Sequence, residues 1–74
     1  MRSINEYNAR SLYHGILRMC EFAAVALDET GYNALKRHHR EALYRLNHGP
    51  LDYRAASALH FATRETLDIY LANQ

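Results

Sequence analysis

The run Gly-Ile-Leu-Arg-Met-Cys-Glu-Phe-Ala-Ala-Val-Ala-Leu, residues 15–27, is the stretch around which the rest of this chain must fold. On an α-helix, with about 100° between successive residues, apolar side chains share one side of this stretch. These apolar residues are Ile16, Met19, Cys20, Ala23 and Leu27, and Leu12 from the preceding turn lies on the same side. Further apolar residues lie well outside that stripe, namely Phe22, Val25 and Ala26, with Ile4 and Tyr7 near them upstream.

A helix that is apolar on two sides is either buried or packs its second side against a partner. We therefore predict a long central helix, at about residues 4–28, that the other helices of the chain cover. The surplus apolar side predicts a homodimer in which Phe22 and Val25 contact a second copy.

The chain has 74 residues and a single cysteine, Cys20. A chain this short buries only about 60% of its unfolded surface, and its core seldom supplies more than about 3–5 kcal/mol of stability without staples or partners. No disulfide can form within the chain, and Cys20, in an apolar stripe beside Met19, is expected to be a small core residue. The prediction is one compact all-α domain of three helices, spanning residues 1–74, that dimerises.

The first helix has recognisable signals at its start, middle and end. Ser3 and Glu6 have the spacing of a capping box. Gly15 inside the helix indicates a close contact with another helix, since a glycine there costs about 1 kcal/mol relative to alanine. Gly31 predicts a left-handed residue that ends this helix, while Thr30 is the alternative signal, a cap for the next one.

The second and third helices are predicted at about residues 32–47 and 52–72. Asn47-His48-Gly49-Pro50 is a strong stop signal, because glycine favours the left-handed cap and proline cannot continue the helix. Asp52 is expected to cap the third helix. The inward stripe of the second helix is predicted to be Tyr32, Leu35, His39, Ala42, Leu43 and Leu46. That of the third is predicted to be Ala55, Ala56, Leu59, Ala62, Thr63, Thr66, Leu67 and Tyr70.

Positive charge is concentrated in the predicted second helix, where four basic residues stand against one acid, Glu41. Its outward side carries a candidate partner-binding set: Arg37, Arg40, Tyr44 and Arg45. Arginines can neutralise phosphates and a tyrosine can stack on a base, so one hypothesis is a regulator that binds nucleic acid through this helix. The other is an acidic protein partner.

A helix-turn-helix DNA reader is disfavoured by its spacing rules. The motif needs a small residue four positions before the turn glycine and apolar residues six and nine positions after it. Counted from Gly49, the small position is Arg45, and counted from Gly31, the apolar positions are Arg37 and Arg40. We therefore favour a protein partner over nucleic acid.

Catalytic and metal-binding patterns are not present in the sequence. Two ligands on one helix face need a spacing of three or four residues, and no two of the five histidines have it. A nucleophile with an adjacent base, a phosphate-binding glycine loop and a recognisable acid pair are not found either. The prediction is a protein that is not an enzyme and has no cofactor and no metal.

The N-terminus lacks the apolar core of a signal peptide, and the longest apolar run is far shorter than the roughly 20 residues needed to span a membrane. We therefore expect a soluble, cytoplasmic protein.

Phe61 is the residue hardest to explain as part of the core. On the predicted third helix it lies about 200° from the inward residue Leu59, among charged neighbours. Together with Ile69 and Ala58 it is expected to form a small apolar patch on which a partner docks. The function that fits these features is a non-catalytic module that binds another macromolecule and modulates its activity, as regulators, antitoxins and phage-type inhibitors of host machinery do.

Overall fold

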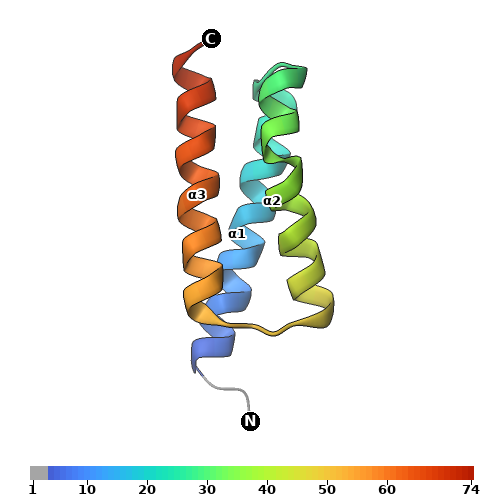
Figure 1. Ribbon diagram of the computed structural model, residues 1–74, viewed down its shortest axis with the longest axis vertical. Helices are drawn as coiled ribbons and strands as arrows, with labels where there is room; N and C mark the ends of the chain where they lie inside the picture. Colours follow the sequence, from blue (N-terminus) through green and yellow to red (C-terminus); the bar gives the residue numbers. More distant parts are fainter. Residues whose placement is uncertain (1–3) are drawn as a thin grey trace.

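The computed structural model describes residues 4–74, which form three α-helices and no strand. They are α1 (Ile4–Ala26), α2 (Glu29–His48) and α3 (Tyr53–Ala72). The chain runs up α1, down α2 and up α3, so that the start of α1 and the end of α3 lie at opposite ends of the bundle (Figure 1). The molecule is elongated, with extents of 44 × 18 × 14 Å. The predicted compact all-α architecture of three helices is confirmed.

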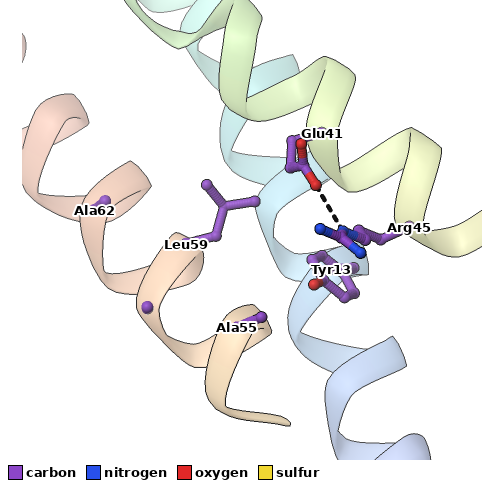
Figure 2. Close-up of a pocket in the computed structure, with 7 residues that line it drawn as sticks. Tyr13, Glu41, Arg45, Ala55, Leu59 and Ala62 are labelled. Atoms are coloured by element: carbon purple, nitrogen blue, oxygen red, sulfur yellow. Dashed lines mark hydrogen bonds and ion pairs between the residues drawn. The ribbon is translucent and has the colours of Figure 1, made fainter. Parts of the chain in front are cut away.

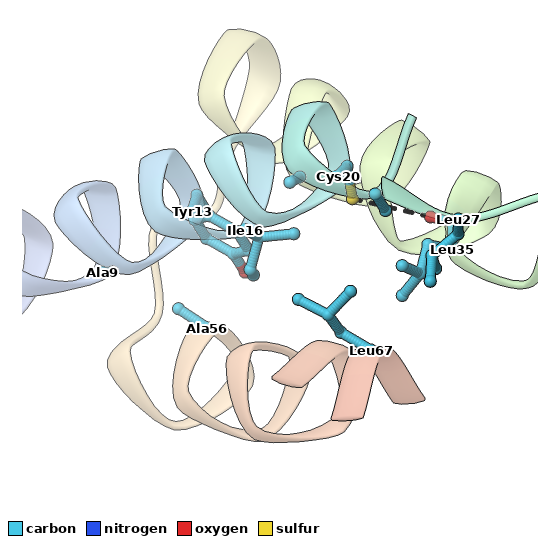
Figure 3. Packing of buried hydrophobic residues seen from close by; sticks show 10 residues of the cluster. Ala9, Tyr13, Ile16, Cys20, Leu27, Leu35, Ala56 and Leu67 are labelled. Carbon is cyan, nitrogen blue, oxygen red and sulfur yellow. Dashed lines mark hydrogen bonds between the residues drawn. The ribbon is translucent and has the colours of Figure 1, made fainter. Parts of the chain in front are cut away.

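The central role predicted for the first helix is also observed. α1 packs along both other helices, whereas α2 and α3 contact each other less extensively. Its buried residues follow steps of four and three, and the pattern continues to Leu27 directly after the helix: Ala9, Tyr13, Ile16, Cys20, Ala23 and Leu27. Figure 3 shows these residues meeting Leu35 from α2 and the side chains of Ala56 and Leu67 from α3. A 4-3 repeat of this kind keeps one seam of a helix directed at its neighbours.

The predicted stripe of α1 was partly misplaced. Leu12 and Met19 lie at its edge and are only partly buried, while Ala9 and Tyr13 are core residues that it omitted. Tyr13 is 1% exposed. It lines a hollow together with residues of α2 and α3.

The connection between α1 and α2 differs from the prediction. Asp28 caps α2 by accepting a hydrogen bond from the amide of Gly31 at 2.9 Å. Gly31 therefore lies inside α2 rather than ending α1, and α2 begins at Glu29 instead of residue 32. A side chain at Gly31 would have its Cβ 3.0 Å from Leu27 Cβ and 3.3 Å from Tyr70 Cδ1. This glycine is needed for close packing of the three helices, not for a turn.

The other predicted helix ends are observed where they can be compared. Gly49 has a φ of 67° and its amide donates to the Arg45 carbonyl at 2.8 Å, which ends α2. Asp52 Oδ2 accepts from the amide of Ala55 at 2.9 Å and starts α3. The capping box predicted at Ser3 lies outside the described residues.

Gly15 marks a close helix contact, as predicted. A Cβ at this position would lie 3.1 Å from Nε2 of His60, whose ring reaches α1 from α3. The contact brings α3 near the α1 backbone at mid-height of the bundle.

The inward side of α2 is rotated relative to the prediction. His38, not His39, bridges to α3: its Nδ1 lies 3.1 Å from Oγ1 of the fully buried Thr63. Since the Thr63 hydroxyl donates to the Leu59 carbonyl at 2.7 Å, it accepts from an Nδ1–H of His38. Leu43, predicted inward, is exposed, and so is Ala55 on α3.

Candidate functional site

The lower halves of α2 and α3 leave a hollow between them, shown in Figure 2, with a volume of about 340 Å³. Tyr13 of α1 forms its floor. The α3 wall is built mainly of alanines, whose small side chains leave room for close approach to α3. The lining residues are Tyr13, Glu41, Arg45, Ala55, Ala58, Leu59 and Ala62.

An ion pair forms the α2 wall of this hollow. Arg45 Nε donates to Glu41 Oε2 at 2.6 Å, between residues one helical turn apart (Figure 2). The bond to Glu41 raises the pKa of Arg45. Burial raises the pKa of Tyr13, although nearby Arg45 acts in the opposite direction. The phenol is therefore neutral at physiological pH, and the hollow carries no unbalanced charge.

A second hollow, of about 350 Å³, lies on the outward side of α2. It is lined by Arg37, Arg40, Glu41 and Tyr44. Among residues 4–74 neither arginine has a carboxylate within ion-pair distance. Because Glu41 borders both hollows, we treat them as one surface, the α2–α3 face, with an apolar part over α3 and a positive part over α2.

The aromatic ring of Tyr44 stands at the edge of the positive part. It is exposed and tilts against the ring of His48, with 4.7 Å between the ring centroids. The structure thus brings Arg37, Arg40 and Tyr44 together as predicted. It places Arg45 in the neighbouring hollow, where Glu41 balances its charge.

Phe61 and Ile69 are exposed on α3, at 67% and 54%. Ile69 follows Ala62 by seven residues, or two turns, and so extends the apolar wall of the α2–α3 face. Phe61 is rotated about 100° away from Ala62 and does not line either hollow. Ala58, which is exposed and lines the first hollow, lies one turn before Phe61 and connects the two.

Phe22 and Val25 lie on α1, away from the α2–α3 face. Both are exposed, at 51% and 88%, which agrees with their predicted position outside the inward stripe. Contact with a second copy through these residues stays a prediction.

The only cysteine is buried, as predicted. Its thiol points to the Leu35 carbonyl at 3.7 Å, and burial, followed by the nearby charge of Glu21, raises the pKa of Cys20 to about 11. A thiol in this state is a poor nucleophile at neutral pH. Within the described residues no group of three or more histidine, cysteine or acidic side chains is placed to hold a metal ion.

No helix within residues 4–74 has the length and apolar character needed to cross a membrane. Comparison of the chain with known protein families, curated proteins and solved structures finds no match. The class that the fold defines is an antiparallel three-helix bundle, and its function is argued from the geometry.

Glu41 and Tyr13 line the first hollow and were not predicted as site residues, although both had a signal in the sequence. Glu41 and Arg45 are four residues apart, with the acid first, which is the favourable order for a pair on one helix. Tyr13 follows the 4-3 repeat that begins at Ala9. The hollow itself depends on how far α2 and α3 diverge, which neither helix encodes alone.

Proposed function

We propose that this protein is a non-catalytic interaction module that binds another protein through the α2–α3 face and thereby modulates that protein's activity. The observation that carries the proposal is that Arg37 and Arg40, which have no ion pair among residues 4–74, adjoin a hollow with an apolar α3 wall. Regulators, antitoxins and phage-type inhibitors of host machinery belong to this class.

The chemistry of the face specifies the kind of partner. Small side chains along α3 allow a helix to approach closely, and an amphipathic helix binds a groove of this type through apolar residues one turn apart. The positive side of the face requires acidic residues on the adjoining edge of that helix. The expected partner segment is therefore an acidic amphipathic helix, which would lie against α2 and α3 as a fourth helix.

The test begins with site-specific photo-crosslinking in the native host. A photoreactive phenylalanine analogue at Tyr44 should capture a defined protein, and the same analogue at Arg64, on the opposite side of α3, should not. The captured protein is then purified and titrated against the wild type and an Arg37→Glu/Arg40→Glu variant. We expect the double variant to bind at least tenfold more weakly, while Arg64→Glu binds like the wild type.

Equal affinity of the double variant and the wild type would contradict the proposal. So would a captured protein whose activity is unchanged when this chain is added in excess.

Phe61 is expected to add to the same contact from the outer edge of α3. Its ring is largely exposed, so Phe61→Ala should leave the thermal midpoint nearly unchanged. An aromatic anchor at an interface contributes about 2 kcal/mol or more, so the same change should weaken binding by roughly thirtyfold. A lowered thermal midpoint without a separate loss of binding would show that Phe61 stabilises the fold instead.

A nucleic-acid partner is the second candidate, because Arg37, Arg40 and Tyr44 are exposed together. Titration with unrelated DNA and RNA at low salt decides between the two. Binding through phosphates would weaken with salt, with a logarithmic slope of about −0.9 per neutralised phosphate on duplex DNA. Binding to either nucleic acid that the Arg37→Glu/Arg40→Glu change abolishes would replace the protein partner in the proposal. We expect no such binding.

A further inference from the structure

The outward face of α1 carries a second repeat, independent of the buried one. Its positions follow steps of three, four, seven, four and three: Ile4, Tyr7, Ser11, Arg18, Phe22 and Val25. The four apolar residues are all exposed, Ile4 at 78%, Tyr7 at 72%, Phe22 at 51% and Val25 at 88%. They form two apolar ends, separated by a polar middle. We call these six positions the outer stripe.

The outer stripe has the same spacing, and the same order of apolar and polar positions, from either end. Counted inward from its two ends, Ile4 matches Val25, Tyr7 matches Phe22, and Ser11 matches Arg18. The midpoint falls between His14 and Gly15. When two copies of α1 lie antiparallel about a two-fold axis at this midpoint, each apolar end faces the opposite apolar end of the other copy. Such self-complementarity is what a two-fold interface requires.

The charges on this face distinguish antiparallel from parallel pairing. In a parallel pair, each Arg18 would face the same arginine of the second copy, and Arg10 likewise, which is unfavourable for like charges. In the antiparallel pair, Arg18 faces Ser11 of the other copy, and Arg10 of that copy is one residue away along the axis but about 100° further round its helix. No arginine then directly faces the same arginine of the second copy, so the charges favour the antiparallel orientation.

Arg10 provides a second, independent reason for this orientation. It lines a hollow of about 270 Å³ with Tyr7, Ser11, His14 and Arg18. Its Nε is buried and has no hydrogen-bond partner among residues 4–74, although buried polar groups are almost always bonded.

Glu21 is the acid that the antiparallel pair brings to Arg10. On α1 the two residues lie within about 20° of each other, and Glu21 is exposed with no ion pair among the described residues. In the pair, Arg10 lies opposite Met19 of the second copy, so that Glu21 of that copy is about 3 Å further along the axis. A long arginine side chain spans this offset.

We propose that the outer stripe of α1 is a homodimer interface, in which two copies of this chain pair antiparallel about a two-fold axis between His14 and Gly15. The contact is about 32 Å long and one helix wide. It is small compared with a standard interface of about 1,600 Å², so the dissociation constant is expected in the micromolar range. The α2–α3 face lies elsewhere on the bundle and stays free in this dimer.

Sedimentation equilibrium between about 1 and 200 μM tests whether the dimer forms. We expect a reversible dimer, and Phe22→Glu or Val25→Glu should weaken it at least tenfold while circular dichroism stays unchanged. The matched control is Phe61→Glu, which places the same charge on another exposed phenylalanine, outside the outer stripe. A monomeric wild type at 200 μM overturns the proposal, and so does a dimer that Phe22→Glu does not weaken.

The orientation is tested by disulfide trapping in a Cys20→Ala background. Chains carrying Ser11→Cys are mixed with chains carrying Arg18→Cys under mild oxidation, and the products are identified by mass. Antiparallel pairing brings the two different positions together, so the mixed disulfide should form several times faster than the Ser11→Cys homodisulfide. Preferential formation of homodisulfides would overturn the antiparallel arrangement.

A charge swap tests the contribution of Arg10. Arg10→Glu should weaken the dimer by a few-fold, and adding Glu21→Arg should restore it, because both charges are then reversed in the same pair. Glu21→Arg alone should also weaken the dimer, because it faces the unchanged Arg10. Adding Arg64→Glu, on α3 outside the stripe, to Glu21→Arg should not restore dimerisation. Absence of rescue in the first combination would contradict the predicted pairing of Arg10 with Glu21.

Discussion

The apolar residues on the two long faces of α1 have similar spacing, but one face is buried and the other is exposed. The inner face carries an unbroken line of apolar residues from Ala9 to Leu27, and α2 and α3 cover it. The outer stripe has apolar residues only at its ends, larger on average than those inside, and the described chain leaves them exposed. The comparison shows that the continuity of a stripe, and the presence of small residues within it, determines which face the chain buries in its own fold.

The two faces are expected to differ most in how much stability is lost when a side chain is shortened to alanine. Ile16 is fully buried on the inner face, so Ile16→Ala should lower the free energy of unfolding by about 2–5 kcal/mol, because a cavity remains. Val25→Ala, on the outer stripe, should change it by less than about 0.5 kcal/mol in dilute solution. Urea denaturation of both variants, at a protein concentration below the dissociation constant of the dimer, measures the contrast. Similar losses would show that Val25 is covered within a single copy.

Thiol reactivity gives the next largest contrast. The pKa of Cys20 is raised to about 11 from an ordinary value of 9.0, so its thiolate is about a hundredfold less abundant than that of an unperturbed thiol at neutral pH. Burial adds steric protection. Alkylation by iodoacetamide should therefore be at least a hundredfold slower than for Val25→Cys in a Cys20→Ala background, measured at high dilution. Comparable rates would mean that the inner face opens readily.

The two helix glycines of α1 and α2 should respond to alanine in opposite ways. At Gly31 a Cβ would meet Leu27 Cβ at 3.0 Å within the packed core, and overpacking of this kind costs about 1–3 kcal/mol. At Gly15 the nearest atom is the end of the His60 ring, at 3.1 Å, which can rotate away.

Gly15→Ala is therefore expected to be neutral or to stabilise the fold by up to about 1 kcal/mol through helix propensity. Thermal unfolding of the two variants provides the measurement. A destabilised Gly15→Ala variant would indicate that the His60 ring is held in place.

The smallest expected effect is a pH dependence that involves the inner side of α2. Burial, followed by the positive charge of Arg37, lowers the pKa of His38. The unfolded chain then binds more protons than the folded chain, so this histidine makes stability decrease as the pH falls through its unfolded value of about 6.5.

Thr63 of α3 is hydrogen-bonded to this ring, and its hydroxyl also donates to the Leu59 carbonyl. The charged group that acts on the ring is Arg37 of α2. Urea denaturation at pH 7.5 and 5.5 should show a smaller loss of stability in His38→Gln than in the wild type. An unchanged pH dependence in His38→Gln would contradict the prediction.

Much of the fold could be predicted from local signals. The stop at Gly49-Pro50 and the cap at Asp52 lie at predicted ends because each depends on backbone chemistry within one helical turn. Gly31 was misinterpreted because glycine has two uses, a left-handed turn and a close packing contact. Only the positions of Leu27 and Tyr70 reveal that the second applies here.

For the site residues, the sequence by itself determined which side chains are exposed better than it determined which side chains lie close together. The exposed positions of Phe22, Val25 and Phe61 follow from helical periodicity, which depends only on the angle between successive residues. The distinction between His38 and His39 required the rotation of α2 against Thr63. The hollow over Tyr13 required the divergence of α2 from α3. These two features arise from packing between helices, where side-chain volumes from distant parts of the chain set the rotation and the spacing, and therefore only the tertiary structure decides them.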